Sequence, residues 1–133
     1  VINFMTGSEL NVKVGLSICY DVRFPELYRQ LGEIDIITVP AAFTYETGQA
    51  HWHTLLASRA IENLCYVVGS AQWGEHYGNR KTYGHSMIVD PWGEIKDELP
   101  VGNGLVVSEI DLDHLAEIRS KFPALSHRRI NYD

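Results

Sequence analysis

The stretch GLSICYDVRFPE, residues 15–26, decides the fold because it joins a strand to a helix. From Val12 to Ile18, branched apolar residues alternate with small or polar ones, and this period of two predicts a strand over about residues 11–19. Pro25 suits the first turn of a helix, since its missing N–H needs no partner there, and good helix formers continue to Leu31. The sequence therefore predicts a strand, a turn and a helix in close succession.

Cys19 lies at this strand-to-helix junction. It shares a strand face with Gly15 and Ser17, and on this small-residue face a ligand or a second layer of structure can approach. Backbone N–H groups near such a turn favour a thiolate and can stabilise an oxyanion. An isolated cysteine is more often a buried, inert core residue, so the residues alone leave both interpretations open.

Charged residues crowd the segment after Cys19, where a buried strand has just ended. They are Asp21, Arg23 and Glu26. An ion pair between Arg23 and either carboxylate would brace the turn and would explain this cluster. We therefore expect these three side chains to support the turn.

A second strand is predicted at residues 34–39, an almost continuously apolar run rich in β-branched residues. Strand, helix and strand in this order form a βαβ unit, which predicts parallel pairing in a sheet covered on both faces. Ligands bind at the carboxyl ends of such strands. The loop 40–48, which carries Phe43 and Thr44, should therefore lie beside Cys19. Its composition is equally compatible with an ordinary connection between a strand and a helix that has no functional role.

The remaining chain alternates further apolar runs with turns, and no internal boundary divides residues 1–133. Cys65 reads as a core residue at the start of a strand. The histidines at 51 and 53 face different sides of a helix, which disfavours a shared metal. The expected elements are a turn at 6–9, a helix at 49–63, a strand at 65–72, a mobile loop at 73–81, a hairpin of 83–90 with 94–98, a strand at 105–110 and a helix from about 112 to 122.

Composition excludes several classes of protein. The net charge is −6 and the one basic run is at 127–129, which disfavours nucleic acid or an acidic membrane surface as a partner. No apolar run approaches the length of a membrane span. Two cysteines without a zinc-like spacing predict free thiols in a reducing, cytoplasmic compartment.

The pattern Cys-aromatic-Asp-x-Arg-Phe-Pro-Glu at residues 19–26 resembles the nucleophile segment of the nitrilase superfamily, the carbon–nitrogen hydrolases. Within it, the loop with Phe43, the segment with Gly48, His51 and Trp52, and the Gly-His-Ser and Asp-Pro-Trp-Gly motifs at 84–93 are similar to those of Nit-type amidases. The position after Trp52 is commonly Glu in these relatives, whereas this chain has a histidine there. We interpret His85 as a structural hydrogen-bonding residue.

The resemblance implies half of a four-layer αββα sandwich, because it covers only the C-terminal half of the family's α/β fold. It implies a Glu–Lys–Cys triad without metal or cofactor, in which only Cys19 matches a residue of this chain. Tyr20 would supply an oxyanion N–H, while Phe43 and Thr44 would line the substrate pocket. The basic tail at 127–129 would either pack against a partner subunit of a homo-oligomer or be solvated.

The resemblance therefore implies hydrolysis of a small amide, such as deaminated glutathione, through a cysteine thioester with release of ammonia. Other possibilities are an omega-amidase, a nitrilase or a carbamoylase of the same superfamily. From a different class, a half-chain that acts only as an interaction module stays open. Because Glu9 and Lys13 match neither missing triad position, we expect this chain to be inactive by itself and to need a missing N-terminal half or a second chain.

Overall fold

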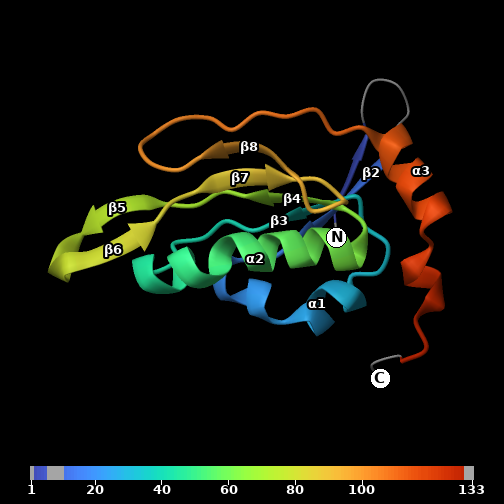
Figure 1. The fold of residues 1–133 in the computed structure, drawn as a ribbon, viewed down its shortest axis with the longest axis horizontal. Coiled ribbons are helices and arrows are strands. Elements are labelled where there is room, and N and C mark those ends of the chain that lie inside the picture. The colour runs from blue at the N-terminus through green and yellow to red at the C-terminus, as the bar shows by residue number, and fades with distance from the viewer. Residues whose placement is uncertain (1, 6–10, 131–133) are drawn as a thin grey trace.

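The computed structural model describes residues 2–5 and 11–130, and its centre is one mixed sheet (Figure 1). Six strands make this sheet in the order β1-β2-β3-β4-β7-β8, and β5 and β6 form a separate two-stranded sheet. The strands are β1 (Ile2–Met5), β2 (Asn11–Leu16), β3 (Ile36–Thr38), β4 (Tyr66–Gly69), β5 (Trp73–His76), β6 (Arg80–Tyr83), β7 (Ser86–Val89) and β8 (Ile95–Leu99).

Helices α1 (Pro25–Gln30) and α2 (Tyr45–Asn63) lie on one face of the six-stranded sheet (Figure 1). Helix α3 (Leu112–Lys121) stands at one end of the sheet, and its N-cap Asp111 accepts a hydrogen bond from the His114 N–H. Three short 3₁₀ turns complete the fold: η1 (Cys19–Arg23), η2 (Tyr77–Asn79) and η3 (Ala124–His127). Within the described part of the chain, no helix is long and apolar enough to cross a membrane.

The βαβ prediction is confirmed. β2 pairs parallel with β3, and β3 pairs parallel with β4. Pro25 occupies the first turn of α1, and Gly32 follows the helix with a φ of 78°. The carboxyl ends of β2 and β3 therefore meet at one sheet edge, where η1 begins.

The small-residue face of β2 accommodates the helical layer. A Cβ on Gly15 would lie 2.6 Å from Cδ1 of Ile34, and a Cβ on Gly69 would lie 2.6 Å from Cδ1 of Leu56. Such contacts are too close for a side chain, so glycine lets the helices and their connections pack directly on the strands. The expected second layer is thus made by the chain itself.

The opposite, outer face of the sheet is only partly covered by the described residues. Val14, Ile36 and Tyr66 share this face at one end, where the Tyr66 hydroxyl donates a hydrogen bond to the Asp111 carbonyl. Towards the carboxyl ends of the strands the face is open, and Leu16 is 51% exposed. The prediction that the second strand, here β3, is buried on both faces is wrong. Ile36 and Thr38 point to the outer face and are only half-buried.

Several boundaries differ from the predictions. β2 ends at Leu16, before the turn, and α2 begins at Tyr45, one turn earlier than expected. The predicted mobile loop at 73–81 is wrong: β5 and β6 pair antiparallel through a turn where Gly78 and Asn79 have φ of 75° and 60°. The hairpin of β7 and β8 is confirmed.

Residues 105–110 form no strand; they run irregularly beside β8, where the Asp97 carboxylate accepts a bond from the Val107 N–H. The expected turn at 6–9 lies outside the described residues.

Candidate active site

Cys19 opens η1 with a backbone conformation that is unusual for a side-chain-bearing residue. Its φ is 46°, in the left-handed region, and its thiol is half-buried. The Cys19 N–H donates to the Pro40 carbonyl at 2.8 Å, which ties the turn to the end of the neighbouring strand. Strained backbone of this kind persists only where the surroundings hold it, and it concentrates at functional sites.

Asp21 supports the turn through the backbone. The Ile18 N–H donates to Asp21 Oδ2 at 2.9 Å, and the Asp21 N–H donates to the Ile18 carbonyl at 3.0 Å. These reciprocal bonds hold Cys19 and Tyr20 between them. Among the described residues the Tyr20 N–H donates no hydrogen bond.

Arg23 links the turn to the loop 40–44 and to α2. Its Nη1 and Nη2 lie 3.3 and 3.4 Å from Nδ1 of His51, and its guanidinium lies 5.2 Å from the ring centre of Phe43 and 5.4 Å from that of Tyr20. Arginine has no acceptor, so Nδ1 of His51 accepts here and its proton sits on Nε2. Arg23 therefore supports the turn by aromatic and imidazole contacts.

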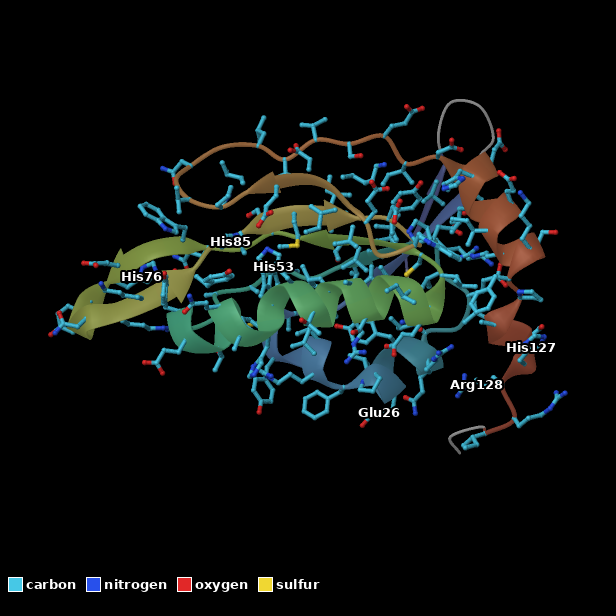
Figure 2. All side chains as sticks on the ribbon, viewed as in Figure 1. Glu26, His53, His76, His85, His127 and Arg128 are labelled. Atoms are coloured by element: carbon cyan, nitrogen blue, oxygen red, sulfur yellow. The ribbon has the colours of Figure 1, made fainter. Side chains whose placement is uncertain are left out.

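The expected ion pairs of Arg23 are absent among the described residues. Neither Asp21 nor Glu26 lies within ion-pair distance of its guanidinium. Glu26 is exposed on the outer side of α1 (Figure 2). Two of the three predicted supporting residues thus meet the turn, and Glu26 does not.

The two residues predicted to line a pocket take different positions. Phe43 is 5% exposed and packs on the Trp52 ring at 4.8 Å between centroids. Thr44 is exposed at the N-cap of α2, with its Oγ1 2.6 Å from Oγ1 of Thr47. Of these two residues, Thr44 presents its side chain to solvent and Phe43 does not.

A buried polar layer under the turn was not predicted. The Tyr28 hydroxyl donates to Ser17 Oγ at 2.8 Å, and the Ser17 hydroxyl donates to the Thr38 carbonyl at 2.9 Å. Arg59, only 4% exposed, donates from Nε to the Val22 carbonyl at 2.9 Å and lies over the Tyr28 ring. Burial raises the pKa of Tyr28, so this hydroxyl stays a donor at neutral pH.

The signal for Arg59 was present in the sequence, as a charged residue amid the apolar positions of α2. Helical periodicity alone could not tell that its partner is a backbone carbonyl thirty-seven residues earlier.

Cys65 contrasts with Cys19. It is fully buried in the core beneath α2, and burial raises the pKa of its thiol to about 12. The prediction that Cys65 is a core residue is confirmed.

A half-buried thiol on a strained strand-to-helix turn, at the carboxyl edge of parallel strands, is the arrangement in which α/β hydrolytic enzymes hold a nucleophile. The carbon-nitrogen hydrolase family model matches residues 3–120, and the chain belongs to this family. A deaminated glutathione amidase from Synechocystis is 55% identical over 117 residues, which are 86% of this chain and 43% of that protein.

Solved structures agree with this assignment. The crystal structure of the Caenorhabditis elegans NitFhit protein matches with a TM-score of 0.82 and 51% identity over 87% of this chain and 29% of that one. A glutamate-to-glutamine mutant of an amidase from Nesterenkonia sp. AN1, in which acrylamide has added to the active-site cysteine, matches with a TM-score of 0.68 and 30% identity over 92% of this chain and 47% of that one. The fold is therefore nitrilase-like, and the chain spans about half or less of the length of these relatives.

Proposed function

We propose that this chain carries the nucleophile of an amidase that hydrolyses small amides through a cysteine thioester. The observation that carries the proposal is the geometry of Cys19, whose half-buried thiol sits on a strained turn. The neighbouring Tyr20 N–H donates no hydrogen bond within the described part of the chain. The similarity to an amidase whose active-site cysteine reacts with acrylamide supports it.

The reaction follows from these groups. The Cys19 thiolate attacks the amide carbonyl carbon, a C–S bond forms, and the Tyr20 N–H donates to the resulting oxyanion. The C–N bond then breaks, and the nitrogen leaves as ammonia after it takes up a proton. Water attacks the thioester, the C–S bond breaks, and the products are a carboxylate and the free thiol.

A base and a cation must come from elsewhere in the complete enzyme. Lys13 lies six residues before Cys19 along the chain, about 20 Å away at the rise of an extended strand, and therefore cannot reach the thiol. We infer that the Glu and Lys of the triad belong to a companion segment and that this chain is inactive by itself. The open outer face of the sheet, with Leu16 51% exposed, supports a companion layer.

The substrate class rests on the relatives. Deaminated glutathione amidases are 50–55% identical to this chain, so we propose the amide of a small α-keto or carboxylic acid of this kind as the substrate. Two free thiols support a reducing, cytoplasmic compartment, and we further propose a homo-oligomer.

The test is release of ammonia from such an amide by the protein as it occurs in its source. Cys19→Ala should abolish release, because no other thiol reaches the turn. Cys65→Ala is the matched control and should keep most of the activity, since Cys65 lies in the core. Equal losses in both variants would contradict the assignment, and a complete protein without any ammonia release would favour an interaction module.

A further inference from the structure

Three side chains that are able to bind a metal meet between α2 and the β7–β8 hairpin. His53 comes from α2, His85 immediately precedes β7, and Glu98 comes from β8. Figure 2 shows the two histidines next to each other, between the helix and the strands. One donor atom from each residue lies within 4.8 Å of the other two.

The present contacts form a compact cluster. Nε2 of His53 lies 2.8 Å from Oε1 of Glu98, and Nδ1 of His85 lies 2.5 Å from the same oxygen. Donors that share one tetrahedral metal ion at about 2.0–2.1 Å stand roughly 3.3 Å apart. Small side-chain rotations therefore suffice to open the cluster around an ion.

His85 is held firmly in place. Its φ is 60°, its N–H donates to the Pro100 carbonyl at 3.1 Å, and its carbonyl accepts from the Trp52 Nε1–H at 2.9 Å. The Tyr83 ring stacks on its imidazole with centroids 4.1 Å apart. This confirms the interpretation of His85 as a hydrogen-bonding residue, and it also fixes the direction of the ligand.

The chemistry of the three side chains suits a divalent cation. Two imidazoles and one carboxylate, each partly buried and each from a different segment of the chain, match the ligand set of Zn²⁺ and of similar transition metals.

We propose that His53, His85 and Glu98 form a binding site for a divalent transition metal such as Zn²⁺, which fastens α2 to the β7–β8 hairpin. His53 Nε2, His85 Nδ1 and a Glu98 oxygen are the ligands, and a water molecule completes the tetrahedron.

The proposed metal ligands are other residues than those of the amidase chemistry proposed for Cys19. They come from α2, β8 and the residue before β7, whereas the nucleophile lies on η1. The inference therefore does not depend on the proposed function, and its readout is metal binding and not ammonia release.

The test is a titration of the complete protein with Co²⁺ and Zn²⁺, in a Cys19→Ser background so that this half-buried thiol contributes nothing. We expect one equivalent of Co²⁺ to give the visible absorption of tetrahedral cobalt, and Zn²⁺ to displace it. His53→Gln and Glu98→Gln should each weaken Zn²⁺ binding at least tenfold. His114→Gln, an exposed histidine on α3, is the control and should leave binding unchanged.

Both Gln variants keep a hydrogen-bonding side chain, so we expect them to fold. Circular dichroism checks that each variant is folded before its metal binding is compared. The proposal is overturned if the starting protein binds no metal at 100-fold excess over protein. It is also overturned if folded His53→Gln and Glu98→Gln bind Zn²⁺ as tightly as His114→Gln does. In either case the three residues form a hydrogen-bonded cluster only.

Discussion

At the scale of single residues, the two thiols differ in the properties that govern their chemistry. Cys19 is half-buried on a strained turn at the sheet edge, whereas Cys65 is fully buried among core side chains. Burial raises the pKa of Cys65 to about 12, so its thiol stays protonated at neutral pH. One chain therefore carries an accessible and an inert cysteine.

We expect iodoacetamide at pH 7.5 to alkylate Cys19 while Cys65 stays unmodified in the folded protein. Only a thiolate reacts, and Cys65 is neither accessible nor ionised. Peptide mass spectrometry at timed intervals measures both rates, with a denatured sample as the control in which both thiols react. Comparable rates in the folded protein would contradict this prediction.

Arg59 is the second residue whose role depends on its exact surroundings. Arg59→Met removes the bond to the Val22 carbonyl and leaves that buried acceptor, and the partner carboxylate of Glu62, unpaired. An unsatisfied buried acceptor costs about 1–3 kcal/mol, so we expect a loss of about 2–3 kcal/mol in the free energy of unfolding. Urea denaturation measures it.

The control for Arg59 is Arg80→Met, an exposed arginine on β6 that should change the unfolding free energy by less than about 0.5 kcal/mol. If both variants lose equally little, then Arg59 does not hold the turn.

At the scale of elements, α2 determines how the β5–β6 hairpin and the loop 40–44 meet the sheet. It begins at Tyr45, directly after the loop that packs on Arg23, and Gly48 in its first turns faces β6. A Cβ at Gly48 would stand 2.5 Å from Cγ of Tyr83. The helix can approach the strand this closely only with glycine at that position.

We expect Gly48→Ala to destabilise the fold by about 1–3 kcal/mol, because the overlapping Tyr83 atoms are near the backbone and cannot rotate away. On an exposed helix position the same change would stabilise, since alanine is the better helix former. Thermal and urea unfolding measure whether Gly48→Ala lowers or raises the free energy of unfolding. Gln49→Ala, at the exposed neighbouring position, is the control. An increase in stability would show that α2 and β6 do not pack this closely.

At the scale of the whole molecule, the helices α1 and α2 cover one face of the sheet (Figure 1), whereas the described residues cover the other face only in part. Leu16 and Ile18 at the sheet edge are 51% and 64% exposed. Exposed apolar surface of this kind marks an interaction site or an aggregation hazard. The chain covers 43% of the length of the similar Synechocystis amidase. We therefore expect a companion segment to cover the exposed part of this face.

We expect carbene labelling to modify the peptide with Leu16 and Ile18 in the 133-residue chain alone, and several-fold less in the protein as it occurs in its source. Burial under a second layer would exclude the reagent. Ile61, exposed on the helical side, serves as the reference position that should label equally in both. Equal labelling of the Leu16 peptide in the two samples would argue against a companion layer on this face.

The sequence by itself determined the βαβ unit, the junction at Cys19, the core position of Cys65 and the family. These features follow from local patterns: alternation, a proline at a helix start, and a contiguous motif. Local patterns also led to errors. The polar, glycine-rich composition of residues 73–81 predicts a mobile loop. In the structure Gly78 and Asn79 instead supply the positive φ values of a hairpin turn.

Only the tertiary structure decided which distant groups meet. Arg23 pairs with His51 and not with a neighbouring carboxylate, and Arg59 reaches a carbonyl under the turn. The spacing of His51 and His53 on one helix disfavours a metal shared by these two residues. The structure instead places His53 beside His85 and Glu98, which come from other segments. Periodicity fixes which face of an element a side chain occupies, whereas contacts between elements depend on packing, which a single sequence does not encode locally.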